Sequence, residues 1–321
     1  MSKNAVEMRL EEHGDVFVDI YNNLYFGGME VIREEDLVHL PATSYTRKVD
    51  GSLRGGIRDI RKENRFGNKY RLICGLENQT GIDNTMPVRV LGYDYADYED
   101  QIKKIEVQNE QNGKPAGSKR IYKNQKLTPV ATGVLYYGEA NWNTPKRLYD
   151  MLEFPEGIDE EIKKLVVDYP INIVQVARLT DEERGRLESD FRLVAEYVAC
   201  RGNKEKWEAF LRNGNHKIRH VEELLDVLWE LSKDERYFML IDKIRNEEEK
   251  EEWHMCELAE YLENIGIEKG MKDGIRSGIF AMIKDNLEEN KSRDQIVKKL
   301  VRYFAVSEED AGKYYNELIA G

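Results

Sequence analysis

Apolar positions recur at two different spacings in the first part of the chain. Residues 15–26 (DVFVDIYNNLYF) place apolar side chains three and four positions apart and are followed by two glycines, which predicts a short amphipathic helix. Shorter segments that alternate or run apolar predict strands, and these cover residues 37–45, 55–62 and 70–79. A turn at Arg65–Asn68 separates the last two, so we expect them to form a β-hairpin.

A longer helix and two more strands follow the hairpin. Residues 87–107 begin with a proline and carry apolar side chains along one side, which predicts a helix. Residues 127–138 and 171–179 are apolar runs of strand length. The order helix, strand, hairpin, helix, strand, strand indicates an α/β core.

From Thr180 onward the pattern becomes helical. Thr180 precedes three acidic residues, as an N-cap does, and amphipathic segments continue to the end. We therefore divide the chain into a core over residues 1–180 and a helical region over residues 181–321, which ends in a helix pair over 292–304 and 307–318.

Four glycines recur at every fourth position of this helical region, each followed by an apolar residue: Gly266, Gly270, Gly274 and Gly278. Each glycine costs a helix about 1 kcal/mol relative to alanine. The row therefore predicts the close approach of another helix, or alternatively a broken segment.

The charge is distributed unevenly. The 321 residues include 49 Lys and Arg against 61 Asp and Glu, for a net charge of −12. Residues 1–150 contain 22 basic and 22 acidic residues, so the excess acid lies entirely in residues 151–321. Within the first part, nine basic residues but only three acidic ones lie between Arg47 and Arg71, a distribution suited to binding phosphate groups.

Composition also bears on location. No apolar run is long enough to span a membrane, and the charged opening MSKNAVEMRLEEHG does not resemble a signal peptide. Cys74, Cys200 and Cys256 are widely spaced, without a disulfide or zinc pattern. We expect a soluble, cytoplasmic protein without a membrane partner.

The candidate chemistry lies on the hairpin. Strand alternation places Glu77 and Gln79 on one face, and the turn would bring Asp59 beside Glu77. Two adjacent carboxylates repel each other unless a cation or a proton lies between them, and Mg²⁺ is the usual cation at such oxygen sites. This ion suits phosphodiester hydrolysis, with Gln79 orienting water and with Arg61 and Lys62 as the nearest phosphate contacts. A solvated strand edge paired with arginines is the alternative.

Several segments together resemble the Rpn family of recombination-promoting nucleases/putative transposases, within the PD-(D/E)XK nuclease superfamily. They are DVFVDIYNNLYFGG, IRDIRK, LICGLENQT, MPVRVLGYDYADY, LTPVATGVLYYG and the late helix with glycine at every fourth position. The resemblance implies a restriction-endonuclease-like mixed-sheet core flanked by helices, which cleaves DNA with Mg²⁺, or with Mn²⁺ as the alternative ion.

The resemblance also assigns roles. Asp59 and Glu77 match the two metal-binding acids, and Gln79 stands where many members of the superfamily carry lysine. Arg89, with Tyr93 one turn on, matches a recurrent arginine that serves either as a phosphate or carboxylate clamp or only as a helix-surface residue beside Glu77. The first helix usually offers an acid to the site; Asp15 and Asp19 are both candidates, and we favour Asp19.

These observations lead to one main hypothesis and two rivals. The main hypothesis is a Mg²⁺-dependent DNA endonuclease linked to recombination or transposition, which forms homo-oligomers through its C-terminal helices. The first rival is a catalytically inactive, transposon-derived DNA-binding or assembly protein. The second rival is a protein-interaction module whose acidic helical half is the functional part.

Overall fold

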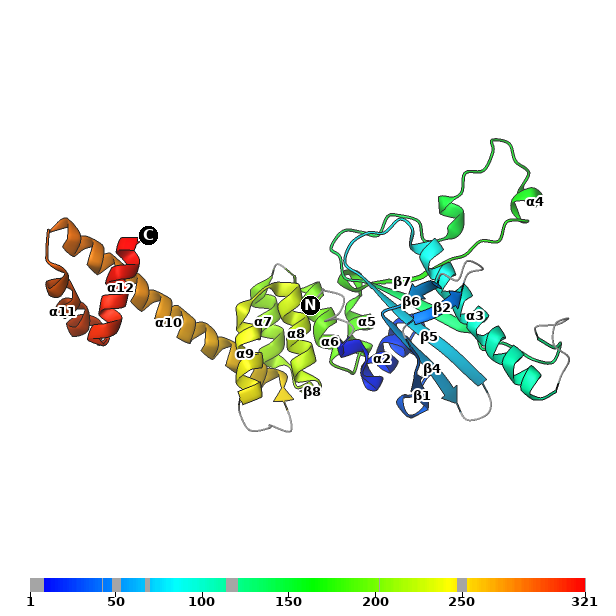
Figure 1. Cartoon of the computed structure of the whole chain (residues 1–321), viewed down its shortest axis with the longest axis horizontal. Coiled ribbons are helices and arrows are strands. Elements are labelled where there is room, and N and C mark those ends of the chain that lie inside the picture. Colours follow the sequence, from blue (N-terminus) through cyan, green and yellow to red (C-terminus); the bar gives the residue numbers. More distant parts are fainter. Residues whose placement is uncertain are drawn as a thin grey trace.

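A computed structural model describes the protein over residues 9–41, 43–47, 53–66, 70–113, 121–201, 203–246 and 253–320. Within these ranges, no helix is long and apolar enough to cross a membrane. The sheet, with helices packed on it, lies at one end of an elongated molecule, and the C-terminal helices extend to the other end (Figure 1).

A five-stranded mixed sheet forms the centre of the core, in the order β1-β4-β5-β6-β7. The strands are β1 (Leu37–His39), β4 (Ile60–Phe66), β5 (Tyr70–Gln79), β6 (Val130–Tyr136) and β7 (Asn172–Gln175). β1, β4 and β5 are antiparallel neighbours, whereas β5, β6 and β7 run parallel. The sequence-based prediction of an α/β fold with a mixed sheet is therefore confirmed.

Helices cover both faces of the sheet. α2 (Gly14–Ile20) continues into a π-helical turn, η1 (Tyr21–Tyr25), and packs against one face. α3 (Met86–Gln111) crosses the other face on the way from β5 to β6, and its first turns share a small apolar cluster with β6. Parallel neighbours require such a crossover connection. The predicted helices over 15–26 and 87–107 are both present.

Three predicted strands differ in their limits. The segment 37–45 forms two strands on either side of Pro41, because β2 (Thr43–Arg47) leaves the main sheet and pairs with β3 (Leu53–Ile57). The segment 55–62 is likewise divided between β3 and β4. The segment 171–179 ends early, because β7 gives way to the 3₁₀ turn η4 (Val176–Arg178). Of the predicted turn after β4, residues 67–69 lie outside the described residues.

The remaining elements of the core are short. They are the 3₁₀ turns η2 (Glu34–Asp36) and η3 (Leu148–Met151) and the helix α4 (Glu160–Lys163).

The chain after residue 180 is helical, as predicted. Its helices are α5 (Asp181–Arg186), α6 (Phe191–Ala199), α7 (Lys204–Asn213), α8 (Val221–Ser232), α9 (Glu235–Asn246), α10 (Met255–Glu288), α11 (Arg293–Phe304) and α12 (Glu308–Ala320). A short ribbon joins β8 (Lys217–Ile218) to β9 (Trp253–His254). Thr180 is the predicted N-cap of α5, in a capping box with Glu183.

One apolar core joins the sheet to the first helices of this region. It contains α2 residues, the inner face of β5, and side chains of α6 to α9 and of the start of α10 as far as Ile265. A separate cluster, which includes Ile283, Ile296 and Leu300, holds α11 and α12 against the end of α10. Apart from the small cluster between α3 and β6, the described apolar residues thus form two bodies, and α10 joins them.

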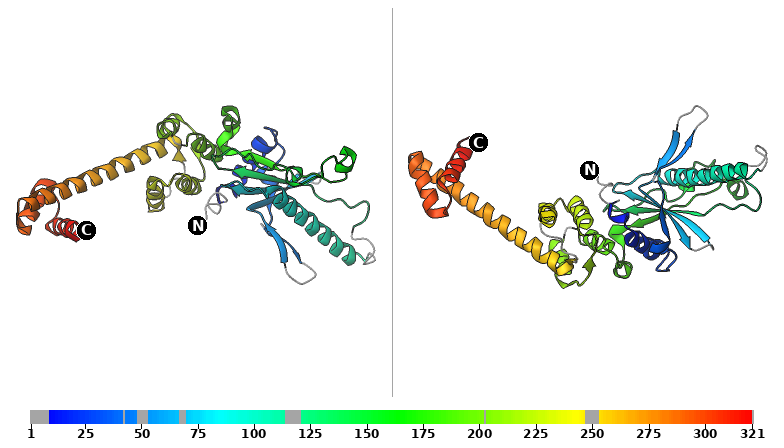
Figure 2. Two further views of the ribbon diagram at one scale, coloured as in Figure 1. Left: turned by 90° about the horizontal axis from the view of Figure 1, so that it is seen from above. Right: turned by 60° about the horizontal axis from the view of Figure 1, so that its bottom comes forward.

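α10 is a single helix of 34 residues, which corresponds to about 50 Å. Figure 2 shows its middle part running between the two bodies. A Cβ added at Gly270 or Gly274 meets nothing within 4 Å, whereas Phe304 lies 3.1 Å from the corresponding position at Gly278. The predicted close approach is thus present at Gly278, where α11 ends. The alternative, a broken segment, is excluded.

Candidate active site

The two predicted metal-binding acids lie side by side at one end of the β4–β5 hairpin. The antiparallel register pairs Ile60 with Leu76, and the next position places Asp59 opposite Glu77, on the same face. Asp59 Oδ2 accepts a hydrogen bond of 2.7 Å from the backbone N–H of Asn78. Gln79 Nε2 donates to Glu77 Oε1 at 3.2 Å. The structure therefore brings Asp59, Glu77 and Gln79 together.

Burial makes this pair of carboxylates electrostatically unfavourable. Glu77 is 3% exposed. Burial and then the nearby charge of Asp59 raise the pKa of Glu77 to about 7, against the opposing effect of Arg89. Burial also raises the pKa of Asp59, although the hydrogen bond from Asn78 opposes this. Among the described residues, no hydrogen-bond partner reaches the buried oxygen Glu77 Oε2. The site therefore contains a buried hydrogen-bond acceptor, Glu77 Oε2, next to the second acid, Asp59.

Arg89 partly neutralises the pair. Its guanidinium donates to Glu77 Oε1, to the hydroxyl of Tyr93 at 3.0 Å and to Asp83 Oδ2 at 2.7 Å. The side chain is 36% exposed. Asp83 also accepts hydrogen bonds from Thr85, directly before α3 begins, so the start of the helix and the arginine are held by one carboxylate. Arg89 therefore contacts Glu77 directly and keeps an exposed side, which is compatible with both roles considered for it.

A buried ion-pair network supports the site from α3. Arg58 is 1% exposed, and its guanidinium lies 2.7 Å from Asp94 and 2.8 Å from Asp97. It lies over Gly75, where an added Cβ would approach Arg58 Nη1 to 2.5 Å. These partners of Arg58 were not predicted from the sequence, although two acids three positions apart on one helix face, Asp94 and Asp97, were a usable signal.

The placement of Arg61 and Lys62 departs from the expectation that they contact phosphate. Arg61 is buried and forms an ion pair of 2.6 Å with Asp97 beneath α3. Lys62 is fully buried on the opposite face, where its ammonium donates to the carbonyl of Glu12 at 2.6 Å and lies over the Phe17 ring. Burial lowers its pKa to about 8. Neither cation reaches the surface, so we correct this assignment.

The first helix does not supply the acid expected of it. Asp19 accepts hydrogen bonds from the backbone N–H groups of Glu188 at 3.0 Å and Ser189 at 2.8 Å, and from the Ser189 hydroxyl at 2.6 Å. Asp15 instead lies 2.9 Å from His220 Nε2. These contacts direct both acids toward the helical region and away from Glu77, and we correct the assignment of Asp19 accordingly.

Glu11 is the N-terminal acid connected to the hairpin. It is 1% exposed and accepts a hydrogen bond of 2.6 Å from the side chain of Asn78, the residue between Glu77 and Gln79. The hydroxyl of Tyr137 donates to its other oxygen. Glu11 precedes the periodic segment of the first helix, so the sequence pattern gave no signal for it.

Two carboxylates are available to hold a metal ion at the site. In the part of the chain that the structure describes, no group of three or more His, Cys, Asp or Glu residues could hold one. Mg²⁺ is commonly bound through one or two carboxylates with several waters retained. The unpaired oxygen of Glu77 and the adjacent Asp59 fit that requirement.

The fold and this site define a class of protein: an α/β core whose hairpin presents two adjacent acids, a glutamine and an arginine. The family model described as putative transposase, YhgA-like, matches residues 40–211, more than half of the chain. The chain belongs to this family, and the resemblance seen in the sequence is confirmed. The matched residues include Asp59, Glu77 and Arg89. No curated protein and no solved structure matches the chain.

Proposed function

We propose that the protein is a Mg²⁺-dependent DNA endonuclease that hydrolyses phosphodiester bonds and acts in recombination or transposition. The observation that carries the proposal is the pairing of Asp59 with Glu77, whose Oε2 is buried without a partner among the described residues. Membership of a family described as transposases supports DNA as the substrate.

Asp59 and Glu77 would hold the metal ion, Mg²⁺ or alternatively Mn²⁺. When bound, this ion supplies Lewis-acid stabilisation of the negative charge that develops on phosphate during hydrolysis. Two ionised acids side by side on neighbouring strands favour a divalent cation because it removes their mutual repulsion.

Gln79 and Arg89 would act on the substrate side. The amide of Gln79 is held by Glu77 Oε1, so it can orient a water molecule at the rim of the site. Arg89 is fixed by Asp83 and Tyr93, and its exposed edge can donate hydrogen bonds to a phosphate oxygen. Anchoring the guanidinium in advance reduces the entropy lost when the phosphate binds.

The DNA backbone would meet the basic residues that remain exposed on the hairpin. Arg65 and Arg71 form a cross-strand pair, and Arg71 is 61% exposed at the side chain. They lie six residues along β5 from Glu77, which corresponds to about 20 Å. This spacing suits contacts to a duplex that extends away from the cleaved bond. Such contacts predict a steep loss of affinity with added salt, which an acidic protein-interaction module would not show.

One observation favours the inactive, DNA-binding alternative. Arg89 already supplies a positive charge to Glu77, so the described site is partly neutral without an ion. A protein that retained only DNA binding could keep this arrangement for stability.

Plasmid nicking distinguishes the two. We expect the parent chain to nick supercoiled DNA in Mg²⁺ and not in EDTA, and Asp59→Asn and Glu77→Gln to lower the rate at least about a hundredfold. Asp310→Asn, on α12, is the matched control and should leave the rate unchanged. Equal nicking by parent, variants and EDTA samples would remove the enzymatic proposal and leave the DNA-binding one.

A further inference from the structure

Glu11 contacts β5 from the face of the sheet opposite the paired acids. Because side chains alternate along a strand, Asn78 points away from the face that carries Glu77 and Gln79. On that opposite face the side-chain amide of Asn78 is fully buried and donates to Glu11 at 2.6 Å. Glu11 is itself 1% exposed, so it meets neither a metal ion between the acids nor DNA directly.

The backbone of the same asparagine contacts the acid pair. The N–H of Asn78 donates to Asp59 Oδ2 at 2.7 Å. Asp59 precedes β4, and the ladder between β4 and β5 begins only at the Ile60–Leu76 pair. The ladder therefore does not fix the position of Asp59, and the hydrogen bond from Asn78 helps to hold its carboxylate at the site.

Tyr137 connects Glu11 to the next strand as well. Its hydroxyl donates to the other oxygen of Glu11, and its backbone N–H donates to the carbonyl of Gln79 at 2.8 Å. One buried carboxylate thus links the ends of β5 and β6, beyond the point where β4 supports β5. A buried and hydrogen-bonded network of this kind makes the groups attached to it more rigid.

We propose that Glu11 is a positioning residue of the metal site. It holds Asn78 from the opposite face of the sheet, and Asn78 in turn holds Asp59 beside Glu77. The inference rests on the proposed nuclease function. Groups that orient metal ligands from behind commonly change metal affinity or activity by about tenfold to a hundredfold when they are removed.

The test removes the carboxylate without leaving its tyrosine partner unpaired. Glu11→Met/Tyr137→Phe replaces both groups by apolar ones of similar size, which a buried site tolerates better than the loss of one partner. Calorimetry on the full chain measures Mn²⁺ binding, which is at least about tenfold weaker in the double variant than in Tyr137→Phe alone. The kcat for plasmid nicking in Mn²⁺ falls by a similar factor. The KM for DNA changes by less than about twofold, because Glu11 lies on the face away from the substrate.

A conservative variant separates the hydrogen bond from the charge. Glu11→Gln keeps an oxygen that accepts from Asn78, so it retains Mn²⁺ affinity and kcat within about threefold of the parent. A loss as large as that of the double variant would contradict positioning through this hydrogen bond.

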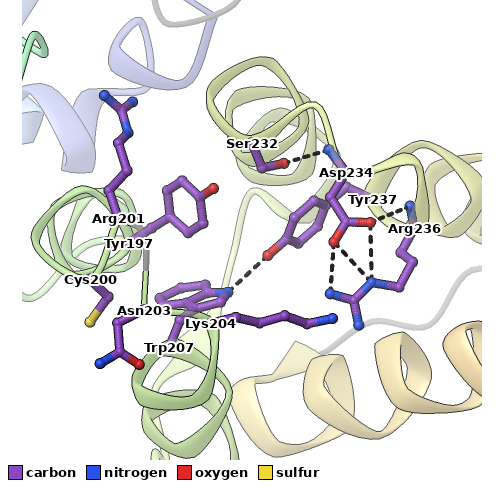
Figure 3. Close-up of a pocket in the computed structure, with 10 residues that line it drawn as sticks. All are labelled: Tyr197, Cys200, Arg201, Asn203, Lys204, Trp207, Ser232, Asp234, Arg236 and Tyr237. Carbon is purple, nitrogen blue, oxygen red and sulfur yellow. Dashed lines mark hydrogen bonds and ion pairs between the residues drawn. The ribbon is translucent and has the colours of Figure 1, made fainter.

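Tyr237→Phe is the matched control for the loss of a buried tyrosine hydroxyl. Tyr237 and Tyr137 are both 2% exposed, and the hydroxyl of Tyr237 accepts a hydrogen bond of 2.8 Å from Trp207 Nε1 in the helical region (Figure 3). Its substitution leaves Mn²⁺ affinity and kcat unchanged. An equal loss in this control would show that only general stability is involved, and it would overturn the proposal.

The remaining outcomes distinguish this inference from the nuclease proposal. Equal Mn²⁺ affinity and kcat in Glu11→Met/Tyr137→Phe and in Tyr137→Phe overturn the role of Glu11 and leave the nuclease proposal standing. A parent chain that binds no Mn²⁺ removes the nuclease proposal, and the role of Glu11 with it.

Discussion

Gly75 allows a charged side chain to be buried directly beneath the candidate active site. The guanidinium of Arg58 occupies the space that a side chain at position 75 would need, and it joins β4 and β5 to Asp94 on α3. Glu77 of the carboxylate pair lies two residues further along β5 on the same face, so the pair depends on this arrangement. When one partner of a buried ion pair is displaced, the other charge stays buried without compensation. This destabilises the fold more than replacing the whole pair by apolar residues would.

Gly75→Ala should therefore lower the free energy of unfolding by about 2 kcal/mol or more, because the new methyl group displaces Arg58 from its acids. Chemical denaturation measures this. Gly92→Ala is the matched control: nothing lies within 4 Å of its added Cβ, and alanine favours the helix, so it should be neutral or stabilising by up to about 1 kcal/mol. Equal effects at both positions would contradict the role given to Arg58.

The local sequence pattern correctly predicted the positions of site residues whose partners are close in the sequence. Strand alternation and a turn were sufficient to place Asp59 beside Glu77. The roles predicted for Arg61 and Asp19 were wrong because their partners are distant in the sequence. Arg61 pairs with Asp97 on α3, 36 positions away, and Asp19 accepts from Ser189, 170 positions away and just before α6. A charged residue in a strand has the same local pattern whether it is exposed or ion-paired beneath a helix.

At the scale of elements, α2 meets the start of α8 through two stacked imidazoles. The rings of His13 and His220 lie 3.6 Å apart, nearly parallel. Burial disfavours the charged form of His220, but the hydrogen bond and charge of Asp15, with further help from Asp190 and Glu223, raise its pKa. Burial disfavours the charged form of Asp15, but the hydrogen bond and charge of His220, together with the Val16 amide and the charge of Arg219, outweigh it and lower the pKa of Asp15 to about 2. The first helix of the core is thus tied to the helical region by an ion pair.

This tie should weaken as the pH rises. Since the pKa of His220 is raised in the folded state, its contribution is fully present below its ordinary value near 6.5 and is lost as the pH passes through the folded value. Asp15 stays ionised throughout. A double-mutant cycle of Asp15→Asn and His220→Gln should give a coupling of about 1 kcal/mol at pH 6 and much less at pH 9.

The exposed pair Lys313–Glu309 on α12, 2.8 Å apart, is the control for this cycle. Its lysine remains charged between pH 6 and pH 9, so its small coupling should not change. A pH-independent coupling between Asp15 and His220 would contradict the ion pair.

The strand limits show what a pattern of apolar residues leaves open. Residues 37–45 read as one extended run, yet β1 joins the main sheet and β2 pairs with β3 beside α3. The sequence predicted extended backbone for both β1 and β2. It did not predict their partners, because each pairs with a strand that lies later in the sequence: β1 with β4, and β2 with β3. The helices were placed more closely, since their hydrogen bonds are local.

At the scale of the whole molecule, the middle of α10 leaves a row of apolar side chains exposed. Three large apolar side chains recur every fourth residue there: Ile267, Met271 and Ile275. Met271 is 63% exposed, and nothing lies within 4 Å of the added Cβ at Gly270 or Gly274. We propose that a second copy of α10 packs on this stripe, as the glycine spacing suggested.

Met271→Glu should convert an oligomer into a monomer, because a charge cannot be buried between two helices without a partner. Size-exclusion chromatography with light scattering measures the change. Met29→Glu is the matched control, since Met29 is also 63% exposed and lies outside α10. A parent chain that is monomeric at tens of micromolar would refute this arrangement.

The hydrogen bonds of Asp19 have a consequence for synthesis of the protein. Its carboxylate is buried in the finished molecule, yet the amides of Glu188 and Ser189 that satisfy it follow 169 and 170 residues later. A ribosome needs roughly ten to thirty seconds to add that much chain. During that time the Asp19 carboxylate lacks the partners it has in the finished fold, so α2 reaches its final environment only after a segment beyond the predicted boundary at residue 180 has been added.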